Sequence, residues 1–216
     1  MPVQVKICGI NSVAAADAVL HAGADFGGLV FFAKSPRHLS LEQGAMLAER
    51  MRERLKLAAL VVDDSDAQLA AIAERVKPDF FQLHGRETPE RVAQIRSQYG
   101  IPVIKALAVS EPGDLAKVSA YDDVAEMLLF DAVPAANAAR PGGHGAAFDW
   151  QIVKDRTFAR PWFLAGGLSP DNVARAMQLS GARLVDVSSG VESAPGVKSS
   201  DRIADFIAAA KQTVRA

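Results

Sequence analysis

The chain has one cysteine, few aromatic residues and no excess of charge of either sign, and each of these features excludes a class of protein. A single cysteine, Cys8, excludes an internal disulfide. Lys and Arg total 24 against 25 Asp and Glu, so the chain has no broad field to attract nucleic acid or an anionic membrane. Aromatic residues make up 6% of the sequence, which leaves few rings on which bases could stack.

Targeting and metal-binding patterns are also missing. The sequence has no charged start followed by an apolar signal core, and it has no long uncharged apolar run. We therefore expect a cytoplasmic protein with neither a membrane nor a nucleic acid as partner. The four histidines lack a ligand spacing such as H-E-x-x-H, so we expect no metal.

What the sequence does contain is a repeated alternation of short β-like runs with stretches of helical period. Half of its 216 residues are hydrophobic, enough for one sizeable core or two small ones. We predict the simpler arrangement, a single domain over residues 1–216. Eight strands are predicted, at residues 3–8, 25–32, 57–62, 79–84, 102–108, 126–131, 161–165 and 183–187.

Several of the intervening stretches open with a recognisable helix start. Asn11 or Ser12 can cap the helix after the first strand. The other starts are two capping boxes and two caps followed by proline at the first helical position: Ser40 with Gln43, Ser65 with Gln68, Thr88-Pro89 and Ser169-Pro170.

Eight βα units favour a closed (β/α)8 barrel, an α/β fold. The continuously apolar strands, such as residues 57–62, suit a parallel sheet covered by helices. At 216 residues the chain is short for a barrel of about 250, which implies brief connections. The alternative is an open doubly wound sheet, but the G-x-G-x-x-G fingerprint is missing after the first strand.

In such a barrel the carboxyl ends of the strands share one mouth, so residues far apart in sequence meet there. Those ends carry acids, a thiol and potential anion-binding groups. The residues are Cys8, Lys34 to Arg37, Asp63 and Asp64, Gln82, His84, Asp131, Gly166 and Gly167, and Asp186 to Gly190.

Cys8 and Asp131 are the candidates for acid–base chemistry. A lone cysteine is most often a small buried hydrophobe, but a thiol at the mouth could exchange a proton with carbon if a positive neighbour lowers its pKa. Lys6 lies on the same face as Cys8, one layer deeper. Asp131 follows the apolar run 127–130, so its carboxyl could stay protonated and donate to oxygen, or it could cap the next loop.

Two glycine- and serine-rich loops follow the seventh and eighth strands. In barrels of this class such loops commonly bind phosphate through backbone amides, although turn glycines are the alternative. Arg37 could bind a carboxylate with its guanidinium fork, or be a solvated surface residue. His84 could transfer a proton or be structural.

Six segments together resemble the phosphoribosylanthranilate isomerases of tryptophan biosynthesis: VKICGI, KSPR, QLHG, LLFDA, AGGLSPDNV and DVSSGVE. They run from residue 5 to residue 192 and cover nearly all the strand ends. The resemblance implies a (β/α)8 barrel and an Amadori rearrangement of a phosphoribosyl substrate, with no cofactor and no metal.

The resemblance also implies roles for individual residues. Asp131 matches the general acid that opens the sugar ring, and Cys8 matches the base that removes the proton from carbon 2. Arg37 matches the residue that binds the anthranilate carboxylate. Further substrate-binding positions are Gln82, His84, Gly166, Gly167, Asp186, Ser188, Ser189 and Gly190. The chain is expected to be a monomer or a homodimer.

One position departs from the family pattern, and three other functions compete. His144 stands where the family has threonine in a GGTG segment. The histidine-pathway isomerase performs the same chemistry but uses two aspartates, and Cys8 argues against it. A non-catalytic phosphate-binding barrel would need neither Cys8 nor Asp131. A redox sensor would lack an intramolecular resolving cysteine.

Overall fold

The computed structural model of the chain describes residues 2–133 and 148–212. His144 lies outside the described residues. Eight parallel strands form a closed barrel in chain order, and β8 pairs back to β1. The predicted (β/α)8 barrel is confirmed, and its strand ends agree with the prediction to within two residues. The strands are β1 (Gln4–Cys8), β2 (Phe26–Val30), β3 (Lys56–Val61), β4 (Phe80–Leu83), β5 (Val103–Val109), β6 (Met127–Ala132), β7 (Trp162–Leu164) and β8 (Leu184–Val187).

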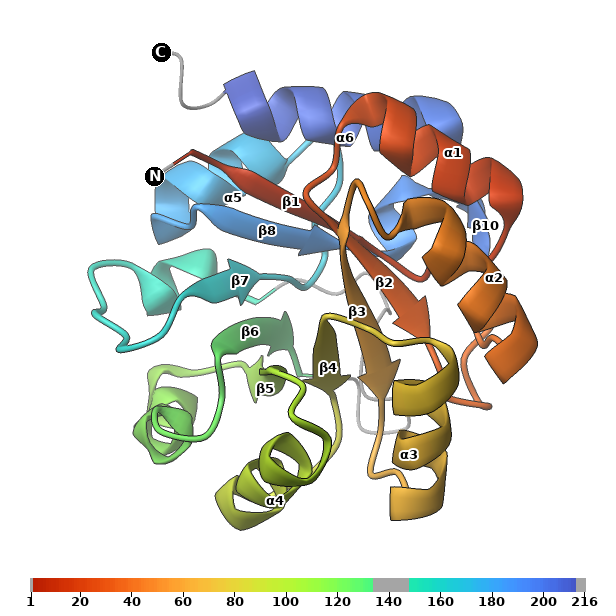
Figure 1. Cartoon of the computed structure of the whole chain (residues 1–216). Coiled ribbons are helices and arrows are strands. Elements are labelled where there is room, and N and C mark those ends of the chain that lie inside the picture. Colours follow the sequence, from red (N-terminus) through yellow and green to blue (C-terminus); the bar gives the residue numbers. More distant parts are fainter. Residues whose placement is uncertain (1, 134–147, 213–216) are drawn as a thin grey trace.

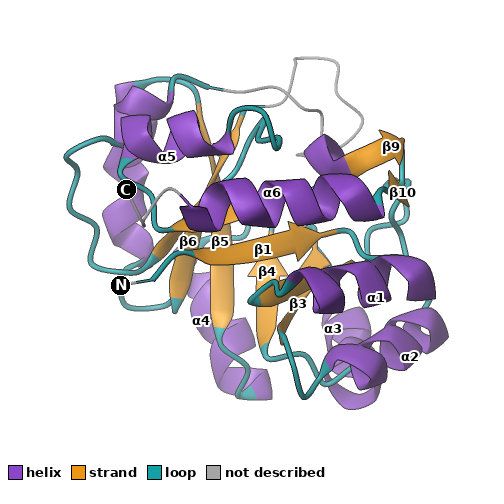
Figure 2. Ribbon diagram, turned by 90° about the horizontal axis from the view of Figure 1, so that it is seen from above, coloured by secondary structure: helices purple, strands orange, loops and turns teal. Residues whose placement is uncertain are grey.

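Helices surround the barrel in a ring (Figure 1). After β5 and β6 the described connections contain 3-10 helices, η1 and η2, in place of α-helices. Figure 2 shows α6, near the C-terminus, lying beside α1, which closes the ring. The α-helices are α1 (Val13–Ala22), α2 (Leu41–Met51), α3 (Asp66–Arg75), α4 (Pro89–Tyr99), α5 (Val173–Ser180) and α6 (Ser200–Gln212), and the 3-10 helices are η1 (Pro112–Tyr121), η2 (Trp150–Val153) and η3 (Ser189–Val191).

Most of the predicted helix starts are confirmed. Ser12 caps α1 by accepting a hydrogen bond from the Ala15 amide, and Thr88 caps α4 with Pro89 in the first turn. Ser40 and Gln43 form the complete capping box of α2. Each cap satisfies a backbone donor that the first turn leaves without a partner.

Two starts differ from the prediction. Ser65 caps α3, but its amide donates to Asp64 Oδ1 (2.9 Å), so the reciprocal bond from Gln68 is not formed. The start predicted at Ser169-Pro170 is wrong, because α5 begins at Val173. The Asn172 side chain instead accepts from the Ser169 amide (2.8 Å) and donates to the Gly167 carbonyl (2.9 Å). These bonds hold residues 167–172 as a turn.

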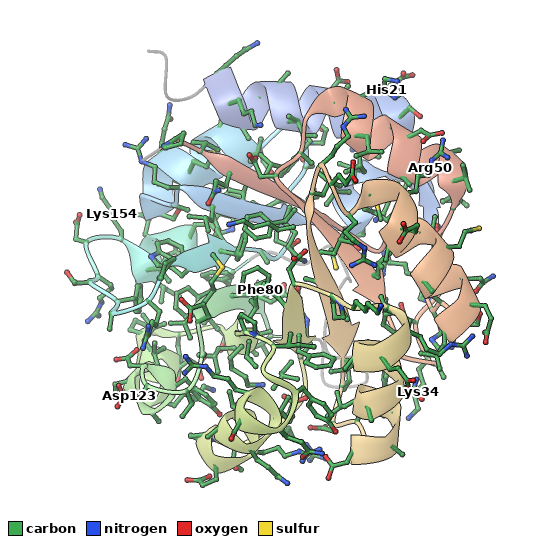
Figure 3. All side chains as sticks on the ribbon, in the orientation of Figure 1. His21, Lys34, Arg50, Phe80, Asp123 and Lys154 are labelled. Atoms are coloured by element: carbon green, nitrogen blue, oxygen red, sulfur yellow. The ribbon has the colours of Figure 1, made fainter. Side chains whose placement is uncertain are left out.

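The core has two parts, because alternate residues of each strand point to opposite faces. One apolar set packs between the strands and the helices. The other fills the lower barrel interior, and Figure 3 shows Phe80 near its centre. The inward set comprises Phe26, Ala58, Phe80, Ile104, Ala106, Met127, Leu129, Phe163, Ala165 and Leu184. Toward the carboxyl ends of the strands, the same inward positions become polar.

Candidate active site

The alternation of side chains along β6 and β8 turns two carboxylates into the barrel interior. Leu184 of β8 and Leu129 of β6 both point into the barrel. The residue two positions further along each strand points the same way. The same alternation therefore turns Asp186 and Asp131 inward, each at the carboxyl end of its strand. Both are buried, as are Lys6 and Gln82.

Lys6 and Asp186 form a buried ion pair below Cys8. They are register partners on β1 and β8, and Lys6 Nζ lies 2.9 Å from Asp186 Oδ1. A Cβ atom added to Gly28, the register partner of Cys8, would lie 2.9 Å from Cys8 Sγ and 3.2 Å from Lys6 Nζ. Gly28 therefore leaves room for the thiol and the ammonium group on the same side of the barrel wall.

The charges around Cys8 oppose the effect of its burial. Burial raises the pKa of the Cys8 thiol and Asp186 raises it further, whereas Lys6, Lys198 and Arg37 lower it; the balance lies above the ordinary value. Burial acts to lower the pKa of Lys6, but Asp186 and Cys8 raise it above its ordinary value. The free protein therefore holds a neutral thiol beside a stable ammonium group at neutral pH.

Asp131 contacts His84 and the backbone of its own strand end. Its Oδ1 accepts a hydrogen bond from the Ala132 amide (2.9 Å), and its Oδ2 lies 3.3 Å from His84 Nε2. His84 Nδ1 lies 3.4 Å from the amide nitrogen of Gln82, whose side chain is fully buried. The predicted residues Gln82, His84 and Asp131 thus form one polar row along β4 and β6.

The two glycine-containing loops meet each other and the end of β6. Gly166 has φ +80°, and a Cβ there would lie 2.7 Å from the Ala132 amide nitrogen and 3.2 Å from Asp131 Oδ1. A Cβ on Gly190 would collide with the Leu168 carbonyl. The close approach needs glycine at both positions. It brings the loops after β7 and β8 together beside Asp131.

Backbone donors are available in these loops. Within the described part of the chain, the amides of Gly167, Ser189 and Gly190 donate no hydrogen bond to another protein group. Such amides can bind the oxygens of an anion.

Arg37 is buried at the same mouth, which excludes the solvated alternative. Its Nε and Nη2 bind Glu192 Oε1 and Oε2 (2.6 and 2.8 Å). A Cβ on Gly9, where φ is +79°, would collide with the Arg37 side chain and lie 3.2 Å from Ser188 Oγ. Gly9 thus lets Arg37 cross the end of β1. A ligand carboxylate would accept hydrogen bonds from the N–H groups of the Arg37 guanidinium that are not bonded to Glu192.

Glu192 and Lys198 were missed by the sequence interpretation. They lie in a short hairpin, β9 (Glu192–Ala194) and β10 (Val197–Lys198), that follows η3. Lys198 Nζ lies 2.9 Å from Glu192 Oε1. The burial of both groups depends on how the hairpin folds back, which neither period nor spacing indicates; the only signal was the position of Glu192 just after the DVSSGV segment.

The sequence matches a known family over nearly its whole length. Residues 5–209 match the family model described as N-(5'phosphoribosyl)anthranilate (PRA) isomerase. The chain belongs to this family. A relative from Rhodopseudomonas palustris (strain BisA53), named N-(5'-phosphoribosyl)anthranilate isomerase, is 52% identical over 215 residues, which are 100% of this chain and 99% of the relative. The chain is therefore an isomerase of tryptophan biosynthesis.

Solved phosphoribosylanthranilate isomerases have the same fold. The structure from Thermotoga maritima has a TM-score of 0.85 at 34% identity, covering 97% of this chain and 99% of that one. Another, in complex with reduced 1-(o-carboxyphenylamino)-1-deoxyribulose 5-phosphate, has a TM-score of 0.83 at 33% identity with the same coverage.

The part of the isomerase that the structure describes contains neither a cluster of metal-binding side chains nor a helix that could span a membrane. Among residues 2–133 and 148–212, no three His, Cys, Asp or Glu side chains are grouped so that they could hold a metal ion. No helix in the described part is long and apolar enough to cross a membrane. The oligomeric state, monomer or homodimer, stays a prediction.

Proposed function

We propose that this isomerase rearranges N-(5'-phosphoribosyl)anthranilate to 1-(2-carboxyphenylamino)-1-deoxyribulose 5-phosphate with Asp131 as general acid and Cys8 as general base. The observation that carries this proposal is that Cys8 is the last residue of β1 and Asp131 the last but one of β6. Both face the barrel interior, Asp131 in line with Leu129, and Cys8 on the face of β1 opposite to Val5 and Ile7. A sugar held in that mouth can present its ring oxygen to one group and its carbon 2 to the other.

Asp131 acts first. Its protonated carboxyl gives a proton to the furanose ring oxygen, the bond between that oxygen and carbon 1 breaks, and the anthranilate nitrogen becomes a protonated imine. The carboxyl must be protonated at the start. The contact of Oδ2 with His84 Nε2 supplies a nearby group that can return the proton after each cycle.

Cys8 acts second. The protonated imine makes the proton on carbon 2 acidic. Cys8 first releases its own proton to water at the barrel mouth and then, as thiolate, removes the carbon 2 proton to give an enolamine. The enolamine becomes the ketone by taking a proton at carbon 1 and losing the proton of its hydroxyl. Burial favours the neutral thiol, so the thiolate depends on positive charge. Lys6 supplies such charge permanently, and the imine formed in the first step adds more when it is needed.

The substrate is held at both ends. Arg37 would bind the anthranilate carboxylate, and the amides of Gly167, Ser189 and Gly190 would bind the phosphate, with Ser188 beside them. Asp186 holds Lys6 and can accept a bond from a sugar hydroxyl. Fixing both ends of the substrate places carbon 2 beside Cys8. The proton transfer then occurs within one oriented complex, which lowers its entropic cost. No cofactor is expected, because the imine nitrogen itself accepts the electrons.

The test is the loss of anthranilate-type fluorescence when the protein meets freshly generated phosphoribosylanthranilate. Cys8→Ser and Asp131→Asn should each lower kcat by about 10²- to 10⁴-fold with little change in substrate affinity, since each removes one proton-transfer group. Asp123→Asn is the matched control, because Asp123 is exposed and lies at the periphery of the molecule (Figure 3). Wild-type turnover in either site variant would refute the role of that residue.

A further inference from the structure

The hairpin β9–β10 is anchored against two of the loops that build the site. The Asn11 side chain donates to the Gly196 carbonyl (2.9 Å), which ties the hairpin turn to the segment after β1. Gly196 has φ +81°, and a Cβ there would lie 2.7 Å from the Pro36 carbonyl oxygen, next to Arg37. Figure 2 shows the hairpin beyond the carboxyl end of β1. It is therefore placed beside Cys8 and Arg37.

Lys198 is the buried cation of this hairpin. Its side chain is 1% exposed, and its Nζ donates to Glu192 Oε1 (2.9 Å), to the Ser188 carbonyl (2.8 Å) and to Ser188 Oγ (3.3 Å). A strongly hydrated ammonium group is buried only where partners replace its water. The partners here come from the loop that carries the proposed phosphate-binding amides.

Through Glu192, Lys198 is also connected to the opposite end of the proposed substrate site. One carboxylate binds both cations: its Oε1 accepts from Arg37 Nε and from Lys198, and its Oε2 accepts from Arg37 Nη2. These bonds link Ser188, Lys198, Glu192 and Arg37 in one row, in which the three charged side chains are buried. Because these charged side chains are buried and bonded to one another, they have little freedom to move independently.

Lys198 also contributes to the charge around Cys8. The groups that act on the thiol are Lys6 on its own strand, Asp186 on β8, Arg37 after β2 and Lys198 on β10. Lys6 is already paired with Asp186. Lys198 lies close to the end of β1, because its Nζ is 3.3 Å from Ser188 Oγ, which in turn is 3.2 Å from where a Cβ of Gly9, the neighbour of Cys8, would lie. Arg37 and Lys198 are therefore two further cations near the thiol.

We propose that Lys198 is a positioning residue of the isomerase, which holds the Arg37 end and the Ser188 end of the substrate site together and places a positive charge near Cys8. This inference rests on the proposed function for its effect on turnover. Its effect on the thiol is independent of any activity.

The experiment uses Lys198→Met, which keeps the length of the stem without the charge, and Lys198→Gln, which keeps a donor without the charge. Lys154→Met is the matched control, because Lys154 is exposed beside β7 on the other side of the molecule from β10 (Figures 1 and 3). Two quantities are measured in each protein: kcat and KM from the fluorescence assay, and the ultraviolet absorbance of the thiolate against pH. Cys8 is the only cysteine of the chain, so subtracting the Cys8→Ser spectrum leaves its signal alone.

Lys198→Met should lower kcat/KM by about 10- to 100-fold, with KM raised, because small displacements of both ends of the site misplace carbon 2. Its thiolate midpoint should move to higher pH, and Lys198→Gln should show the same shift. Lys154→Met should match the wild type in both quantities. A role in packing alone would reduce activity without moving the thiolate midpoint.

The proposal is overturned if the thiolate midpoint of the neutral variants equals that of the wild type, or if kcat/KM of Lys198→Met equals that of an active wild type. If Lys198→Met does not fold, Lys198→Gln decides, because its amide can still donate to Glu192. An inactive wild-type protein would refute the proposed function instead, and the thiolate midpoints would still decide whether Lys198 acts on the Cys8 thiol.

Discussion

The buried pair of Lys6 and Asp186 gives the sharpest stability prediction. Lys6 is fully buried, the Asp186 side chain is 8% exposed, and their charged atoms are 2.9 Å apart. At that distance an effective dielectric constant of about 20 gives an attraction of about 6 kcal/mol, which offsets the desolvation of both groups. Lys6→Met leaves the Asp186 carboxylate buried without its cation. We expect this variant to lose about 3–5 kcal/mol of unfolding free energy.

The matched control replaces both members of the pair. Lys6→Met with Asp186→Leu removes both charges and fills similar volume, so its stability should return close to that of the wild type. Equilibrium urea unfolding of the wild type, both single variants and the double variant gives the coupling energy directly. A loss below about 1 kcal/mol in Lys6→Met, or a double variant no better than the single one, would refute the reasoning.

The pH dependence of this pair follows from the raised pKa of Lys6, which lies above its ordinary 10.5. A pKa raised by folding stabilises the protein below the unfolded value, and the contribution is lost as pH rises through the folded value. The difference between wild type and Lys6→Met should therefore stay constant through neutral and mildly alkaline pH, and shrink only above pH 10.5.

Two further predictions concern Glu192 and His84. The pKa of Glu192 is raised by burial but lowered more by Arg37 and Lys198, to about 2 against an ordinary 4.5. The ionised Glu192 carboxylate therefore contributes about 3 kcal/mol of unfolding free energy above pH 4.5, and this contribution is lost as the pH falls toward 2. Glu192→Gln should lack this loss when its unfolding free energy is measured against pH. If the wild type and Glu192→Gln lose the same unfolding free energy between pH 4.5 and 2, the ion pairs of Glu192 do not stabilise the protein. His84→Gln should lower kcat, yet add little to the defect of Asp131→Asn, because both act on one proton. Additive losses in the double variant would separate the two residues.

The barrel and the acid–base candidates could be predicted from the sequence because both depend on local pattern. Strand alternation puts Lys6 and Cys8 on one face of β1, and counting strands puts Asp131 at the same mouth. The segments 164–170 and 186–192 carry glycine where φ or close approach requires it, as Gly166 now shows. These features depend on residues that are close together in the chain, so one sequence is enough to predict them.

The contacts of Arg37, Glu192 and Lys198 could not be predicted, because they join segments that are far apart in the sequence. The pairing of Arg37 with Glu192 joins positions 155 residues apart, and Lys198 reaches the site because the hairpin β9–β10 lies beyond the carboxyl end of β1. Neither period nor capping chemistry carries that information. The start of α5 differs from the prediction for a local reason: the Asn172 side chain makes a turn with Ser169 and Gly167 that competes with a proline-started helix.

The central claim, that Asp131 opens the ring and Cys8 then removes the proton from carbon 2, is tested most directly with substrate deuterated at carbon 2 of the sugar. Slowing the second step makes cleavage of the carbon–hydrogen bond limit the rate, so the isotope effect on kcat should be largest in Cys8→Ser. Slowing ring opening should suppress the isotope effect in Asp131→Asn below that of the wild type. A larger isotope effect in Asp131→Asn than in Cys8→Ser would contradict the assignment of acid and base.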